Sequence, residues 1–241
     1  MRGAIGSCRA FSLLMLVSPW TNVFAQRVDV QAQLQLVHST AQKIDTRASA
    51  PTVVAWLNLI VTDGGVSVPT PPPGHYRMAQ KKKSFSPHLL IVPLGSIVEF
   101  PNLDPFFHNV FSQFKGKRFD LGLYEAGSTK GVRFDHEGVS YIFCNIHPEM
   151  GAVIITLTTP YFITANGNEN LIWRQVPAGT YDLHVWAEGA DPKDLETLTR
   201  RVHVGPTHDD LGRIAVRTSE TLSAHKNKFG EDYRPEQPNP Y

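Results

Sequence analysis

The chain has 241 residues, which is enough for one large domain or two small ones. Hydrophobic residues make up 41% and charged residues 19%, a composition that excludes fibrous and membrane-embedded classes. The 23 basic and 22 acidic residues give a formal net charge of +1. The chain therefore has no overall positive field to hold a polyanion, and we do not expect nucleic acid as a partner.

Residues 1–25 have the pattern of a secretory signal peptide. Arg2 and Arg9 precede an apolar run over residues 10–17, and residues 23–25 suit cleavage by a signal peptidase. The apolar run is far shorter than the roughly 20 residues that cross a bilayer, and no later segment comes close, so we expect no membrane span. We expect an exported protein, either periplasmic or secreted.

The first predicted strand covers residues 28–36, where every second residue is apolar and glutamine or aspartate lies between. Residues 52–61 are rich in β-branched and aromatic side chains and predict a second strand. The proline-rich segment 68–74 predicts an extended connector, where a domain boundary fits.

Short strand-like runs separated by glycine, proline and asparagine follow this connector. They cover residues 88–92, 96–100, 109–114, 131–134, 139–144 and 152–158. Strands at such regular spacing are typical of a β-sandwich or β-barrel.

The pattern resumes after residue 160 and predicts strands of another sheet. These runs cover residues 171–176, 181–186, 200–204 and 211–216, with a short helix expected over 191–199. Residues 218–241 are poor in hydrophobic side chains and rich in Lys, Glu, Asn and Pro, so we expect a mobile tail there.

Cysteine usage singles out Cys144. Cys8 leaves with the predicted signal peptide, so the mature chain has one cysteine and no internal disulfide. A thiol in an oxidising compartment is oxidised unless it is buried or bonded to a metal. A buried structural thiol is the plainer alternative for this residue.

The neighbours of Cys144 favour the metal. Cys144, His147 and Met150 follow one another at three-residue intervals in a loop between two predicted strands. A thiolate, an imidazole and a thioether are a soft ligand set that suits copper, whose electron-transfer site adds a second histidine. His108, in the segment PNLDPFFHNVFS, is the best candidate for that ligand, although Met150 would also suit a core position.

Other histidines and a lysine triplet have competing interpretations. We interpret His136 as solvated in an exposed turn, and His184 as a structural residue of the later sheet. His88 is either a core histidine or a proton-accepting group near the site. The triplet 81–83 is a solvated loop or a docking patch for an acidic redox partner.

A wider motif surrounds these ligands. Residues spaced as F-x-P-x-x-L-x-V-x-x-G-x-x-V-x-F-x-N precede His108: Phe85, Pro87, Leu90, Val92, Gly95, Val98, Phe100 and Asn102. With the triplet His108-Asn109-Val110, the segment 76–158 resembles the cupredoxins, or small blue copper proteins. The loop 144–150 has the short spacing of amicyanin rather than the longer one of plastocyanin.

The resemblance implies an all-β protein with a cupredoxin Greek-key β-sandwich. It implies one type 1 copper ion held by His108, Cys144, His147 and Met150. It also implies that Asn109 braces the two ligand loops through hydrogen bonds.

A second resemblance lies outside this segment. Residues 168–183, with a Pro-x-Gly-x-Tyr core, are similar to the strand-turn-strand of carboxypeptidase regulatory-like β-sandwich domains, and 51–59 is the candidate pairing strand. The copper domain would then be an insertion, and the combination is similar to proteins described as methylamine-utilisation-type. The predicted division is a signal peptide over 1–25, a discontinuous second sandwich over 26–67 and 160–217, a copper domain over 75–159 and a tail over 218–241.

These patterns predict an electron carrier rather than an enzyme, because no second cluster of ligands accompanies the first. The partner expected from the resemblance is a redox protein, such as a c-type cytochrome or a periplasmic dehydrogenase, docking on the apolar residues beside the ligands. Those residues are Phe106, Phe107, Ile146 and Pro148. The same site would also suit copper buffering or delivery, and a third interpretation is a binding module that uses the fold as a scaffold.

Overall fold

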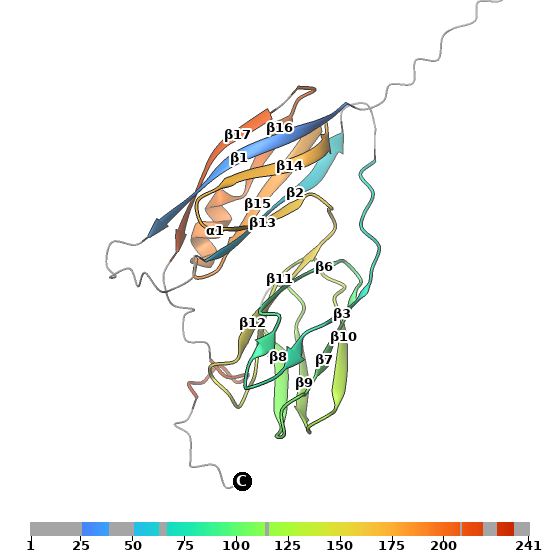
Figure 1. The fold of residues 1–241 in the computed structure, drawn as a ribbon, viewed down its shortest axis with the longest axis vertical. Coiled ribbons are helices and arrows are strands. Elements are labelled where there is room, and N and C mark those ends of the chain that lie inside the picture. The colour runs from blue at the N-terminus through green and yellow to red at the C-terminus, as the bar shows by residue number, and fades with distance from the viewer. Residues whose placement is uncertain are drawn as a thin grey trace, which may run out of the picture.

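A computed structural model describes residues 26–38, 51–62, 67–113, 116–207, 209–218 and 226–233. The predicted signal peptide lies outside these residues. The described chain is almost entirely β-structure, with one short helix, α1 (Pro192–Leu198), which confirms the predicted all-β class (Figure 1). Within the described ranges, no helix combines the length and apolarity needed to cross a membrane.

The central part of the chain forms the module that we call the site sandwich. Its strands are β3 (His75–Arg77), β4 (Ala79–Gln80), β5 (Phe85–Ser86), β6 (Leu89–Pro93), β7 (Ile97–Pro101), β8 (His108–Ser112), β9 (Phe119–Tyr124), β10 (Thr129–Arg133), β11 (Gly138–Phe143) and β12 (Gly151–Leu157). They make a five-stranded sheet in the order β6-β12-β11-β8-β9, a three-stranded sheet β10-β7-β3 and the small pair β4-β5.

Segments that precede and follow the site sandwich in sequence build a second module, which we call the flanking sandwich. Its strands are β1 (Arg27–His38), β2 (Thr52–Thr62), β13 (Phe162–Asn166), β14 (Asn170–Pro177), β15 (Gly179–Ala187), β16 (Arg200–Val204) and β17 (Asp209–Thr218). They form the sheets β14-β1-β17 and β13-β2-β15-β16. The site sandwich thus lies between β2 and β13 in sequence, and Figure 1 shows it below the flanking sandwich.

Burial in β1 follows the period expected of a half-buried strand. Val28, Val30, Ala32, Leu34 and Leu36 are all buried in the core of the flanking sandwich, while the residues between them are exposed or half-buried. Successive side chains of a strand point to opposite faces, which explains the pattern.

Strand β12 behaves differently because both of its faces are buried. Val153, Ile155 and Leu157 pack into the core of the flanking sandwich, whereas Ala152 and Ile154 belong to the core of the site sandwich. Both modules therefore pack on the sheet that leads into the predicted ligand loop.

An ion pair also joins the site sandwich to the flanking sandwich. His88, just before β6, places Nε2 2.8 Å from Oε1 of Glu188, which follows β15. This hydrogen bond is the main cause that raises the pKa of His88, against the opposing effect of burial. It also lowers the pKa of Glu188. Both side chains, His88 and Glu188, are therefore charged in mildly acidic solution.

Replacing His88 with glutamine should destabilise the protein in a pH-dependent way. Because the pKa of His88 is raised in the folded protein, its ion pair adds to the free energy of unfolding. This contribution is complete below the unfolded-state pKa of about 6.5, and it disappears as the pH rises through the folded-state pKa. Because the imidazole is 42% exposed, we expect a loss of only about 0.2–1 kcal/mol near pH 5.5. At pH 9 the part of this loss that depends on the charge of the imidazole should vanish, and only the part that comes from the bond between Nδ1 and the carbonyl of Gly151 should remain. Urea unfolding at both pH values tests this, with His75→Gln on β3 as an exposed control. An equal loss at both pH values would contradict it.

Candidate metal centre

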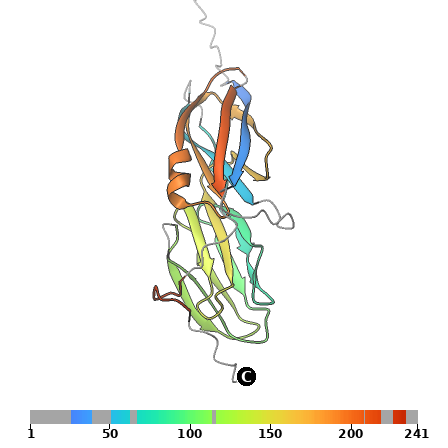
Figure 2. The same cartoon turned by 90° about the vertical axis from the view of Figure 1, so that its left-hand side faces the viewer.

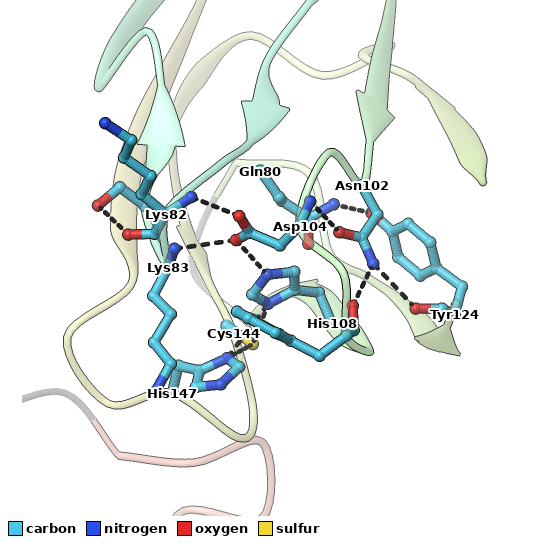
Figure 3. A network of polar contacts seen from close by, with 11 residues as sticks. Gln80, Lys82, Lys83, Asn102, Asp104, His108, Tyr124, Cys144 and His147 are labelled. Carbon is cyan, nitrogen blue, oxygen red and sulfur yellow. Dashed lines mark hydrogen bonds and ion pairs between the residues drawn. The ribbon is translucent and has the colours of Figure 1, made fainter. Parts of the chain in front are cut away.

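The fold brings together three of the predicted ligands. His108 is the first residue of β8, and Cys144 directly follows β11. These strands are neighbours in the five-stranded sheet, with Phe111 paired to Phe143, so the imidazole and the thiol meet at one end of the sheet. His147 comes from the loop that joins β11 to β12 (Figure 3).

The ligand atoms of these residues converge at one point. Sγ of Cys144 lies 3.8 Å from Nδ1 of His108 and 3.6 Å from Nδ1 of His147. The two Nδ1 atoms are 3.1 Å apart. All three side chains are buried, and His147 retains the largest exposure at 8%. One sulfur and two imidazole nitrogens that meet in this way form a donor set that fits copper.

The protein environment leaves the Cys144 thiol protonated until a cation replaces the proton. Burial raises the pKa of the thiol, although the amides of Asn109, Ile146 and His147 lower it in part. Metal ligation requires the thiolate, so binding should release a proton. The same amides would then stabilise negative charge on the sulfur.

The ligand loop is a tight turn, closed by backbone hydrogen bonds at Met150. The amide of Cys144 donates to the carbonyl of Met150 over 3.2 Å, and the amide of Met150 donates to the carbonyl of His147 over 3.1 Å. The Met150 side chain is fully buried in the core of the site sandwich. Its role as the fourth, axial ligand stays a prediction.

Replacing Met150 with leucine should preserve copper binding and raise the reduction potential, because a weak axial thioether tunes the metal without holding it. The two side chains are similar in volume, so the change should cost less than about 1.5 kcal/mol of stability. Copper content and a potentiometric titration test this prediction. Loss of copper from the variant would mean that Met150 is needed to hold it.

Asn109 connects the two segments that carry the ligands. Its Oδ1 accepts the amide of Asn145 in the ligand loop over 3.3 Å. Its Nδ2 donates to Oδ1 of Asp120 on β9 over 2.7 Å. These contacts join the segment of His108 to the ligand loop and to β9, and the bracing role that the resemblance implied stays a prediction.

Sequence reasoning missed Asp104, which lies behind His108. Its Oδ2 is 2.9 Å from Nε2 of His108, so a carboxylate holds the imidazole nitrogen that faces away from Cys144 (Figure 3). Accepting the Nε2 proton leaves Nδ1 as the nitrogen that faces the ligand loop. The available signal was an acid four residues before the histidine in a turn-rich segment.

The backbone of the lysine triplet holds Asp104 in place. The amides of Lys82 and Lys83 donate to its two carboxylate oxygens over 2.6 and 2.9 Å. Both lysines have left-handed backbone angles, with φ of 55° and 52°, which aim successive amides at one carboxylate. Burial alone would raise the pKa of Asp104, but these amides and His108 outweigh it and lower the pKa. Asp104 is therefore ionised.

The remaining histidines considered from sequence lie elsewhere. His88 is at the module boundary, and His136 is exposed beside Asp135. His184 stacks on Trp56 in the flanking sandwich, with ring centroids 5.3 Å apart. Among the described residues, the only group arranged to hold a metal ion is His108, Cys144 and His147.

Comparison with known proteins gives structural neighbours only. No family model and no curated protein matches the chain. Among solved structures, a purple cupredoxin from Nitrosopumilus maritimus is 23% identical over 34% of this chain and 99% of its own, with a TM-score of 0.31. Amicyanin from Paracoccus versutus is 19% identical over 34% of this chain and 81% of its own, also with a TM-score of 0.31.

A copper-containing nitrite reductase from Thermus scotoductus is 20% identical over 51% of this chain, with a TM-score of 0.33, but this covers only 28% of the reductase. Similarity at this level does not assign a function, which must rest on the residues of the site. The resemblance of the flanking sandwich to carboxypeptidase regulatory-like domains stays a prediction.

Proposed function

We propose that the protein is an exported blue copper protein that carries single electrons between redox partners. The observation that carries the proposal is the convergence of His108, Cys144 and His147 in one buried cluster. Export is supported by the sequence pattern of residues 1–25. We propose a periplasmic or secreted location on the same ground.

The site residues would hold one copper ion, with Met150 as the proposed fourth ligand. Copper bound to such ligands alternates between Cu(I) and Cu(II) and so supplies a one-electron couple. Hydrogen bonds hold the residues around it: Asp104 bonds to His108, and Asn109 bonds to the ligand loop. Because hydrogen bonds hold these side chains, they need little rearrangement when the charge of the site changes.

An apolar surface lies beside the ligands and suits brief docking of a partner. The Phe106 ring lies 5.2 Å from the His108 ring and 5.7 Å from the His147 ring, measured between centroids. Phe106, Phe107 and Ile146 are 37%, 55% and 41% exposed. We propose that a redox protein, such as a c-type cytochrome or a periplasmic dehydrogenase, docks here. A small interface of this kind favours rapid exchange.

Spectra of the mature protein after Cu(II) loading test the proposal. We expect an intense visible band from thiolate-to-copper charge transfer and narrow copper hyperfine splitting, both reversibly lost on reduction. A protein that stays colourless yet binds Cu(I) tightly would favour copper buffering or delivery instead. A protein that binds no copper, or that prefers zinc, would overturn the proposal.

A further inference from the structure

Residues 226–233, which we call the C-terminal strap, lie against the ligand loop. They fall within the predicted mobile tail, yet they contact the site through hydrogen bonds to Cys144 and Asn145. The strap is the dark red segment beside the site sandwich in Figure 2. In sequence it follows β17 of the flanking sandwich, so the chain returns to the site after completing the other module.

The strap is a defined turn with its own hydrogen bonds. The side chain of Asn227 accepts the amides of Phe229 and Glu231 over 2.9 and 3.0 Å. Its backbone amide donates to the carbonyl of Glu231, and its carbonyl accepts the amide of Gly230. Gly230 has a φ of +79°, which a residue without Cβ adopts most readily. These bonds fix the turn next to Lys228.

Lys228 closes a ring of hydrogen bonds next to the site. Its amide donates to Oδ1 of Asn145 over 2.9 Å, and its Nζ lies 2.8 Å from Oδ2 of Asp120. Asn109 completes the ring through its bonds to Asn145 and Asp120. Each asparagine directly follows a predicted ligand in sequence, so the ring joins both ligand segments to the strap.

The charge in this ring is set by Lys228 and Asp120. Burial alone would raise the pKa of Asp120, but the ammonium of Lys228 and the donors of Gly122 and Asn109 outweigh it and lower the pKa. The carboxylate is therefore ionised, and its bond to Lys228 is charge-assisted.

Tyr233 provides a second attachment, at the cysteine itself. Its hydroxyl donates to the backbone carbonyl of Cys144 over 2.7 Å. The strap therefore makes hydrogen bonds to two consecutive residues of the ligand loop, Cys144 and Asn145.

We propose that the C-terminal strap is a positioning element that holds the ligand loop closed and slows the loss of bound copper. This inference rests on the proposed function. A movement of Cys144 and Asn145 away from His108 would open the site, and it would also break the bonds to Lys228 and Tyr233. Each of these bonds adds to the barrier for opening.

Two chain lengths test the proposal with a matched control. One form ends at residue 225 and lacks the strap, and the other ends at Tyr233 and keeps it. Transfer of Cu(I) to an excess of a chelator should be at least about fivefold faster from the shorter form, since two or more hydrogen bonds are lost. The form ending at Tyr233 should behave like the full chain. Equal transfer rates for both forms would overturn the proposal.

A point variant keeps the test independent of any folding defect in the shorter form. Tyr233→Phe removes one hydroxyl and should accelerate transfer by about twofold to tenfold. Tyr161→Phe is the control, because that hydroxyl contacts the carbonyl of Gln175 in the flanking sandwich. A rate for Tyr233→Phe equal to that of the full chain would count against the role of this hydroxyl.

Amide hydrogen exchange in the copper-free protein separates this proposal from the proposed function. Loss of the strap should speed exchange at residues 144–147 while leaving β1 unchanged. If the full chain binds no copper, the proposed function fails, but faster exchange would still support the strap as the element that holds the loop. Unchanged exchange at residues 144–147 would overturn the proposal for the strap, whether or not the full chain binds copper.

Discussion

Replacing Cys144 with serine should abolish the intense visible band and the narrow hyperfine splitting of the copper-loaded protein. Both signatures need a thiolate bonded to copper, and a serine hydroxyl supplies neither the charge nor the soft sulfur. Loss of a partner behind a metal ligand already costs about 10–100-fold in affinity. Loss of the ligand itself should cost at least about 100-fold, which a competition titration measures.

The serine variant is informative because the fold should tolerate it. Cys144 is fully buried, and serine is close to it in size, so thermal unfolding should show whether the variant still folds. Thr156→Ser, at another buried position of the site sandwich, is the control and should leave the spectrum unchanged. An unchanged spectrum in the Cys144 variant would refute the copper assignment.

The meeting of Cys144 and His147 was predictable because its signal is local, whereas the role of Met150 stays a prediction. Cys144, His147 and Met150 lie within seven residues, and a tight loop between strands keeps such residues together whatever surrounds them. Strand β1 was predictable for a similar reason, since the alternation of its side chains directly reports one buried face.

Sequence reasoning failed where a contact joins residues that carry no pattern of their own. The apolar run in β12 indicates burial on both faces, but it does not reveal that the second face packs on the flanking sandwich. Lys228 and Tyr233 lie in a polar segment, whose composition shows that it cannot build a core. Composition does not show whether a polar segment is held by hydrogen bonds to another part of the chain.

Asp104 is an intermediate case. Its position four residues before His108 was visible, but an acid in a turn is usually solvated or hydrogen-bonded to nearby amides. It belongs to the site because the left-handed backbone at Lys82 and Lys83 directs two amides to its carboxylate. Lysine rarely adopts this conformation, so the sequence does not predict it. The site thus depends on a turn from a distant part of the sequence.

Replacing Asp104 with asparagine should raise the reduction potential and weaken Cu(II) binding by about 10–100-fold. The carboxylate accepts the Nε2 proton of His108 and so makes the imidazole a stronger donor to a cation, an effect that favours the more highly charged oxidised state. A neutral amide keeps an acceptor in the same place but removes the charge. The size of the change therefore isolates the electrostatic contribution of the carboxylate.

A second variant distinguishes charge from positioning. Asp104→Ala also leaves the buried Nε2 of His108 and the amides of Lys82 and Lys83 without their acceptor, which should cost about 1–3 kcal/mol of stability for each group that water cannot reach. Asp135→Asn, at an exposed carboxylate of the same sandwich, should change neither potential nor affinity. If the asparagine variant keeps its potential while the alanine variant loses copper, then Asp104 acts by orienting His108 and not through its charge.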